Sequence, residues 1–124
     1  MPEIILPEEF YKIIGICMNI HSTLGAGFKE IIYKDVLEFE FRKNNIHFSR
    51  KRKFTVEYKG NILPHYFIAD FIVYDAIILE IKASSMIPGR FVQQTLNYLE
   101  ISNLRLGILA NFGQRSFSSQ RIVL

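Results

Sequence analysis

Residues 67–82 read FIADFIVYDAIILEIK, and this stretch decides the fold. Its near-continuous apolar character predicts two central strands, 66–74 and 76–83, that are covered on both faces of a sheet. Three charged residues interrupt these strands: Asp70, Glu80 and Lys82. Charges at such places must be paired or bound to a metal, because an isolated buried ion is very costly. The stretch therefore predicts the middle of a sheet and, in the same place, a candidate site.

The first part of the chain has helical periodicity. Apolar residues at steps of three and four predict a helix from Pro7 to Leu24, which Gly25 and Gly27 terminate. A second helix is expected from about Lys29 to Asn44. The pattern leaves two alternative buried faces for this second helix: Ile32, Val36, Phe39 and Lys43, or Ile31, Asp35, Glu38 and Arg42.

From Phe48 onward the period changes to two. Alternation as far as Tyr58 predicts a half-buried strand, and residues 59–61 predict a tight turn into residues 62–63. Three elements are expected after the central strands: a helix that includes 91–99, a buried strand at 104–112 and a terminal strand at 120–124. This order is typical of an α/β fold with a mixed sheet flanked by helices. We expect a single domain over residues 1–124.

The composition indicates a folded protein and excludes several other classes of protein. The 124 residues are 49% hydrophobic with a formal net charge of +3, which argues against disorder and suits a polyanionic partner. One cysteine, Cys17, excludes an internal disulfide and a multi-cysteine zinc site. The apolar runs are too short to span a bilayer, and the acidic pair Glu8-Glu9 does not fit a signal peptide. We therefore expect a cytoplasmic protein without a membrane partner.

The order of Asp70, Glu80 and Lys82 suits metal-dependent phosphodiester chemistry. Mg²⁺ prefers oxygen ligands, usually one or two carboxylates, which Asp70 and Glu80 on paired strands can supply. Glu80 and Lys82 are two residues apart on one strand, so both point to the same face. There Lys82 can orient water or stabilise developing negative charge. Ile81 is expected to point into the opposite core, and its backbone carbonyl can also reach the metal.

The Glu-x-Lys triplet alone carries little information, because a second copy occurs at Glu57-Tyr58-Lys59. The second copy lies on the alternating strand beside the turn, so we interpret it as a solvated face. The copy at residues 80–82 lies inside an apolar strand, where that interpretation fails. A structural ion pair is the alternative to a functional site at residues 80–82.

Two further pairs favour a site. Glu30 and Tyr33 lie one turn apart at the start of the second helix. A glutamate there either favours the positive end of the helix dipole or turns inward as a third carboxylate. Gln94 and Tyr98 share a helical face, from which an amide and a phenol can bind phosphate or order water. A surface pair at this spacing needs no such role.

The Gly27-x-x-Glu30-x-x-Tyr33 segment resembles the signature of the GxxExxY proteins, a branch of the PD-(D/E)XK nuclease superfamily. The resemblance covers about Ile13–Val123. It includes Asp70 with Glu80-x-Lys82, and a Gln94-x-x-x-Tyr98 motif similar to that of RecB-type and lambda-exonuclease-like nucleases. It implies a restriction-endonuclease-like core with the order α-β-β-β-α-β. Ala69 stands where the motif has proline, a variation that touches no ligand.

The resemblance also implies roles for the residues of the site. Asp70 and Glu80 would be the metal ligands, Lys82 the catalytic lysine and Glu30 an additional acidic residue. Gln94 and Tyr98 would support them. The expected activity is that of a nuclease that hydrolyses phosphodiester bonds with Mg²⁺ or Mn²⁺ as cofactor.

DNA is favoured over RNA as the substrate of this expected nuclease. The alternative is a non-catalytic nucleic-acid-binding or protein-interaction module with the same fold. The basic run Arg50-Lys51-Arg52-Lys53 either contacts phosphates or solvates a surface. A domain this small has little extra surface for recognition, so a homodimer or a larger protein partner is consistent with the chain.

Overall fold

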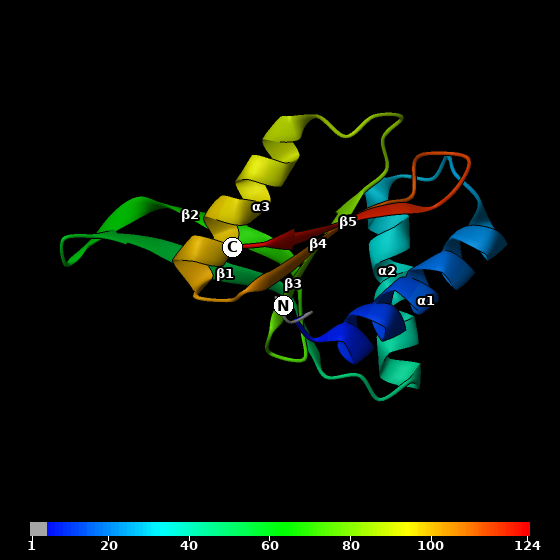
Figure 1. The fold of residues 1–124 in the computed structure, drawn as a ribbon, viewed down its shortest axis with the longest axis horizontal. Coiled ribbons are helices and arrows are strands. Elements are labelled where there is room, and N and C mark those ends of the chain that lie inside the picture. The colour runs from blue at the N-terminus through cyan, green and yellow to red at the C-terminus, as the bar shows by residue number, and fades with distance from the viewer. Residues whose placement is uncertain (1–4) are drawn as a thin grey trace.

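A five-stranded mixed sheet with helices on both faces forms the fold in the computed structural model, which describes residues 5–124 (Figure 1). The strands lie in sequence order across the sheet, and only the β3–β4 pair is parallel. The elements are α1 (Pro7–Leu24), α2 (Glu30–Lys43), β1 (Phe48–Tyr58), β2 (Asn61–Val73), β3 (Ile77–Lys82), α3 (Gly89–Ser102), β4 (Leu106–Asn111) and β5 (Ser118–Val123). The predicted α/β class and the mixed sheet flanked by helices are confirmed.

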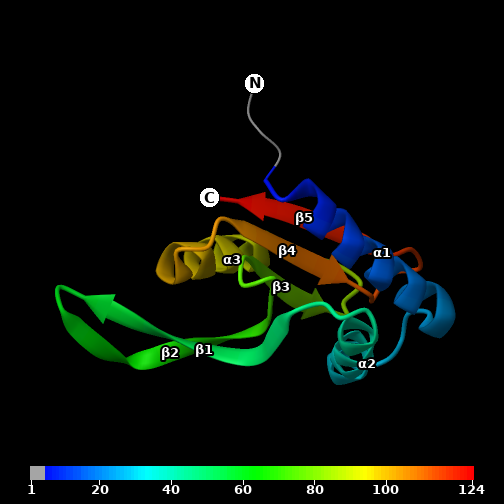
Figure 2. The same ribbon diagram turned by 90° about the horizontal axis from the view of Figure 1, so that it is seen from below.

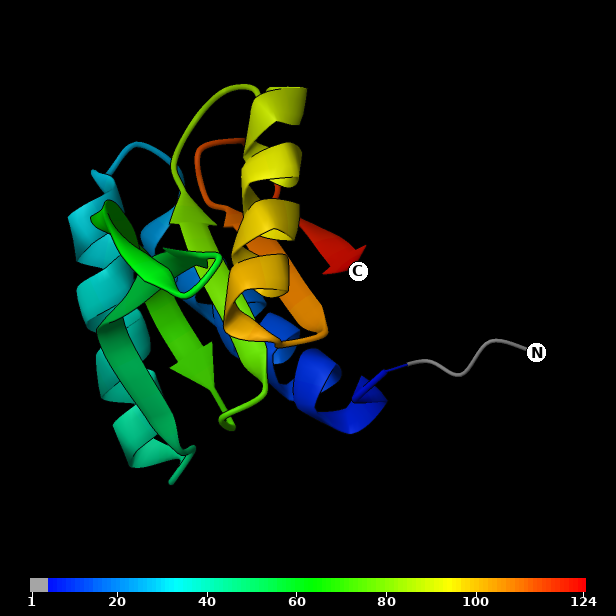
Figure 3. The ribbon, with the colours of Figure 1, turned by 90° about the vertical axis from the view of Figure 1, so that its left-hand side faces the viewer.

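Two apolar cores lie on opposite faces of the sheet. Helices α1 and α2 cover one face, and α3 covers the other (Figure 3). The core under α1 and α2 contains Leu79 and Ile81 of β3, whereas the core under α3 contains Ile78. Every residue of β3 except the last is buried, and β4 is buried throughout. This part of the sheet therefore has the two-sided cover that the sequence predicts.

The buried face of α2 differs from both predicted faces. Tyr33, Leu37 and Phe41 are fully buried at a spacing of four residues, whereas Phe39 is 62% exposed and Ile31 and Ile32 are also exposed. Both alternative faces were therefore wrong. The apolar residues of α2 are distributed on all sides of the helix, so periodicity alone does not select its buried face. Only the row of residues that meets β3 is fully buried.

The hairpin of β1 and β2 is longer than predicted. Tyr58 pairs with Asn61 across the predicted turn, but β2 then continues without a break to Val73 instead of starting again at residue 66. Pro64 fits within β2 because it lies where the register shifts. The hairpin extends beyond the rest of the sheet (Figure 2), and residues 61–66 of β2 are exposed. The two-sided cover predicted for residues 66–74 was wrong at Tyr66 and Ile68, which are 52% and 50% exposed.

Side chains of β2 change faces of the sheet at Asp70. Phe71 and Val73 belong to the core of α1 and α2, whereas Phe67 and Ala69 belong to the core of α3. A regular strand would place all four on one face, because side chains alternate. Lys51 of β1 lies opposite Asp70 of β2, and Lys51 has a φ of +58°. The pairing of the two strands skips this position and resumes on either side of it. The irregularity re-aims the side chains, as β-bulges next to active sites do.

Candidate active site

The two predicted carboxylates meet where β2 and β3 separate. Regular pairing of these strands covers only Phe71–Val73 against Ile77–Leu79. One residue further, the Asp70 N–H donates to Glu80 Oε2 over 3.3 Å, and the Ile81 N–H donates to Asp70 Oδ2 over 2.8 Å. Carboxylate oxygens thus replace the backbone ladder at this point, which brings the two acidic side chains against each other.

Glu80 is a buried carboxyl group that lacks a full set of partners. Its residue is 7% exposed, and its Oε1 atom is buried without a hydrogen-bond partner. Burial, followed by the negative charge of Asp70, raises the pKa of Glu80 to about 9, against the opposing effects of the Asp70 N–H and Lys82. With this pKa the carboxyl group is protonated at pH 7 in the metal-free protein. A perturbed carboxyl beside a second one is typical of functional sites.

Lys34 of α2 is a member of the site that the sequence did not reveal. Its ammonium nitrogen lies 2.9 Å from Asp70 Oδ1, and the two side chains are 23% and 19% exposed. Lys34 lies one helical turn after Glu30 and directly after Tyr33, so the motif pointed to the right segment but not to this residue. Only the position of α2 relative to β2 identifies the pair.

Lys82 occupies the α3 side of the sheet. Its ammonium nitrogen lies 4.1 Å from the centre of the Phe91 ring, a cation–π arrangement. Its positive charge also lowers the pKa of Glu80, which agrees with the predicted common face of the two residues. Ile81 between them is fully buried in the core of α1 and α2, as predicted.

Glu30 begins α2, as the sequence suggests, but the structure does not bring it to the other two carboxylates. Within residues 5–124, no group of three or more histidine, cysteine, aspartate or glutamate side chains lies close enough to hold a metal ion. Lys34, one turn later, faces Asp70 instead. A role for Glu30 as a third carboxylate stays a prediction.

The other two positions of the Gly27-x-x-Glu30-x-x-Tyr33 segment set the start of α2. Gly27 has φ +114°, a conformation that favours glycine. The buried Tyr33 hydroxyl donates to the Gly25 carbonyl over 2.6 Å and accepts from the Phe28 N–H over 3.3 Å. These bonds hold the loop against the first turns of α2, and so position Lys34 beside Asp70.

Tyr98 and Gln94 of α3 border the site. The Tyr98 ring stacks on Phe67 with ring centres 3.8 Å apart. Burial and the negative charges of Glu80 and Asp70 raise the pKa of Tyr98, whereas a hydrogen bond with the Gln94 side chain lowers it. Since Tyr98 responds to both carboxylates, the structure brings these two predicted residues to the edge of the same site.

Asn111 fixes the chain that follows Lys82. Its Oδ1 accepts from the Ser84 and Gly113 N–H groups over 3.1 and 3.0 Å, and its Nδ2 donates to the Ser84 carbonyl over 2.9 Å. The Phe112 N–H donates to the Lys82 carbonyl over 2.8 Å. Asn111 is buried at the end of β4. A buried amide in an apolar strand was the one signal that could have revealed this role.

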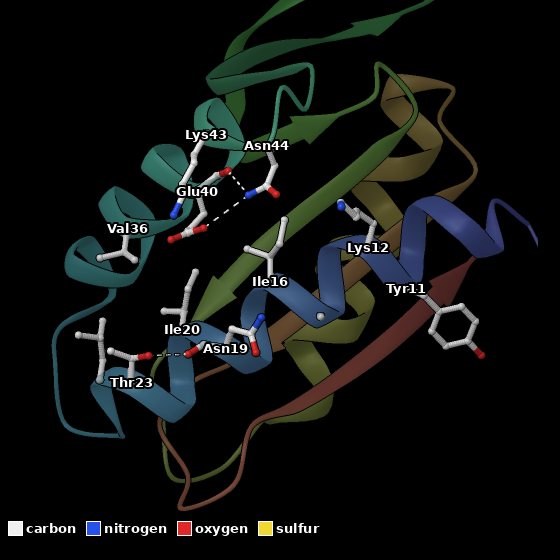
Figure 4. Close-up of a pocket in the computed structure, with 12 residues that line it drawn as sticks. Tyr11, Lys12, Ile16, Asn19, Ile20, Thr23, Val36, Glu40, Lys43 and Asn44 are labelled. Atoms are coloured by element: carbon white, nitrogen blue, oxygen red, sulfur yellow. Dashed lines mark hydrogen bonds between the residues drawn. The ribbon is translucent and has the colours of Figure 1, made fainter.

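A separate cavity of about 520 Å³ lies between α1 and α2 (Figure 4). Asn44 donates to the Glu40 carbonyl over 2.8 Å at its rim. The residues of the carboxylate site do not line it. The cavity is therefore distinct from the candidate active site.

The fold and this site define a restriction-endonuclease-like α/β protein. A family model described as the PD-(D/E)XK nuclease superfamily matches residues 7–122, and the chain belongs to this superfamily. No curated protein matches the chain. No helix within residues 5–124 is long and apolar enough to cross a membrane.

A solved structure with a similar fold matches this chain. It is titled "Crystal structure of SSO0001" and superposes with a TM-score of 0.59 at 21% sequence identity. The match covers 74% of this chain and 48% of the other, so the chain spans about half the length of that protein. At this identity the likeness concerns the fold alone.

Proposed function

We propose that this protein is a Mg²⁺- or Mn²⁺-dependent nuclease that hydrolyses phosphodiester bonds, with DNA favoured over RNA. The observation that carries the proposal is the contact of the partly buried Asp70 with the buried Glu80, whose Oε1 has no partner, beside a lysine on the same strand as Glu80. Membership of the PD-(D/E)XK superfamily supports it. The net charge of +3 suits a polyanionic substrate.

The residues present fit a divalent cation. A buried carboxyl oxygen without a partner beside a second carboxylate is a donor set of hard oxygens, which Mg²⁺ and Mn²⁺ prefer. Asp70 and Glu80, with the Ile81 carbonyl, would hold the ion. The bound ion would polarise the phosphate and lower the pKa of a bound water.

The remaining side chains of the site carry supporting roles in this proposal. Lys82 orients the attacking water or stabilises the negative charge that develops at the phosphate. Lys34 holds Asp70 through its ion pair. Gln94 and Tyr98 bind or order groups at the α3 edge, and Glu30 adds negative charge at the start of α2.

We further assign the chain to the GxxExxY branch of the superfamily. The structure explains why two of the motif positions carry glycine and tyrosine: Gly27 has a positive φ, and the Tyr33 hydroxyl makes two hydrogen bonds. Glu30 lies in the first turn of α2, where its charge favours the positive end of the helix dipole, and a chemical role at the site is the alternative that we propose for it. Beyond nucleic acid, we propose a second copy of the chain or a larger protein as the partner, which the molecular mass in solution distinguishes.

The chain supplies its own control for a test of catalysis. Purified protein is incubated with single- and double-stranded DNA and RNA in Mg²⁺, Mn²⁺ or EDTA. We expect metal-dependent cleavage that Asp70→Ala and Lys82→Ala abolish. Lys59→Ala, in the exposed second Glu-x-Lys copy, should leave the activity unchanged. Cleavage that survives in Asp70→Ala or Lys82→Ala would overturn the assignment.

A non-catalytic binding module is the second candidate. The Lys34–Asp70 ion pair and the neutral form of Glu80 give the site a stable arrangement without a metal, which favours this reading. It predicts salt-sensitive nucleic-acid binding that persists in Glu80→Gln and needs no divalent ion. Metal-dependent thermal stabilisation of the wild-type protein, absent in Glu80→Gln, would exclude it.

A further inference from the structure

A groove between the β1–β2 hairpin and α3 lies beside the candidate active site and shares Gln94 and Tyr98 with it. Its volume is about 570 Å³. Helix α3 contributes Arg90, Gln93, Gln94, Asn97 and Tyr98 to its lining, and β2 contributes His65. These helix positions recur at steps of three and four, so they form one face of α3. The hairpin, which extends past the rest of the sheet (Figure 2), contributes Val56, Tyr66 and Phe67 to the other wall.

The chemistry of the groove suits unpaired nucleotides. Its residues supply amides, an arginine, a histidine and aromatic rings, and none of the described residues that line it is acidic. Amide side chains can hydrogen-bond the edges of bases, and rings such as those of Tyr66 and Tyr98 can stack on their faces. In a duplex the base faces are stacked on one another and the pairing edges are occupied. The lining therefore favours a single strand.

The groove is continuous with the proposed active site. Gln94 and Tyr98, which border the candidate active site, also line the groove together with Phe67, on which the Tyr98 ring stacks. Two cations lie over the Phe91 ring, with the Lys82 ammonium 4.1 Å and the Arg90 guanidinium 5.0 Å from its centre, and Arg90 also lines the groove. Positive charge thus continues from Lys82 to the mouth of the groove, along the path that successive phosphates would take.

We propose that this groove binds a single-stranded segment of the polynucleotide that the active site cleaves. The inference rests on the proposed nuclease function and names the form of its substrate. Arg90 contacts a backbone phosphate. Gln93 and Asn97, whose side chains are hydrogen-bonded to each other over 3.2 Å, turn to the bases when the strand is bound.

Binding can be measured apart from catalysis. Fluorescence anisotropy in EDTA reports the affinity of the full chain for labelled single-stranded DNA and single-stranded RNA, with unlabelled duplex as competitor. We expect Arg90→Ala and the double variant Gln93→Ala/Asn97→Ala to bind at least about tenfold more weakly. Arg90→Ala should also reduce the slope of log K against log salt by about 0.7, the value for one phosphate contact on a single strand.

Lys12→Ala is the matched control, because Lys12 is a helical cation that lines the separate cavity between α1 and α2 (Figure 4). It should bind as wild type. Alanine keeps α3 helical, and circular dichroism melts of each variant check the fold. The DNA and RNA arms tell which polynucleotide the groove prefers.

Two results would overturn the proposal. One is wild-type affinity in both groove variants, and the other is competition by duplex as strong as by single strand. If the groove variants bind and cleave as wild type while Glu80→Gln does not cleave, the groove proposal fails and the nuclease stands. If the wild-type chain neither binds nor cleaves any polynucleotide, both proposals fail together.

Discussion

At the scale of single residues, Asp70 joins three parts of the site. One of its oxygens pairs with Lys34 of α2, the other accepts the Ile81 N–H, and its own N–H donates to Glu80. The carboxylate therefore links a helix, the strand that carries the second acid, and its own strand at the point where side chains change faces. Removal of any partner would change both the geometry and the charge of the pair.

Lys34 should compete with a metal for Asp70. Without metal, we expect Lys34→Met to lower the free energy of unfolding by about 1–2 kcal/mol, because it leaves a partly buried carboxylate without its ion partner. The increase in melting temperature caused by Mg²⁺ should be larger in Lys34→Met than in wild type, since a competing cation is gone. Thermal melts in EDTA and in Mg²⁺ measure both effects. Lys43→Met, an exposed change on the same helix, is the control, and equal Mg²⁺ effects in Lys34→Met and wild type would refute the competition.

Glu80 should make the metal-free protein less stable as pH rises. Its pKa is raised to about 9 in the folded state, so the unfolded chain loses this proton first, from its ordinary pKa near 4.5 upward. The contribution to stability is complete below pH 4.5 and is lost as pH approaches 9. Glu80→Gln removes this loss, and at pH 8 in EDTA it should be more stable than wild type by about 1–3 kcal/mol. Urea unfolding at pH 4.5, 6 and 8 measures the difference, and a pH-independent difference would contradict the assignment.

At the scale of elements, the orientation of α2 decides which of its residues reach the site. The stripe of Tyr33, Leu37 and Phe41 faces the core, and this rotation places Lys34 at Asp70. Because the apolar residues of α2 are spread around the helix, the sequence could not select this face. The strands 77–82 and 106–111 were predictable, because their apolar runs are continuous and only a doubly covered strand accommodates them.

Two phenylalanines of α2 test the observed face. Phe41 is 0% exposed and Phe39 is 62% exposed. We expect Phe41→Ala to cost about 3–5 kcal/mol of stability through the lost burial and the cavity, and Phe39→Ala to change it by less than about 0.5 kcal/mol. Urea denaturation of both variants gives the comparison. Similar losses in the two variants would show that α2 is rotated from the position described.

The centre of the candidate site was predictable where charge interrupts an apolar run, and its edge where Gln94 and Tyr98 share a helical face. Asp70, Glu80 and Lys82 stand out because nothing else explains charge in a buried strand. Lys34 does not stand out, since a helical lysine is ordinary in sequence, and Asn111 stands out only as an amide at the end of an apolar run. Their roles depend on contacts between distant segments, Lys34 with β2 and Asn111 with the loop after β3.

At the scale of the whole molecule, metal binding should be coupled to pH. A cation that binds Glu80 must displace its proton, because burial keeps the carboxyl neutral up to about pH 9. The apparent affinity for Mg²⁺ should then rise by up to about tenfold per pH unit between pH 6 and 8, with release of one proton. Calorimetric titrations in buffers of different ionisation enthalpy count that proton. An affinity independent of pH would mean that the ion does not reach Glu80.

The position of β1 at the edge of the sheet has a consequence for solubility. Edge strands offer unpaired backbone groups that can recruit a strand from another chain, and lysines on the edge are a common defence. In β1, Lys51, Arg52 and Lys53 are exposed, while Arg50 is held by Asp35 at 2.8 Å. The basic run that suggested phosphate contact thus also protects a long, protruding hairpin from intermolecular strand pairing. Neutral β-forming residues in its place would turn this hairpin into a seed for aggregation.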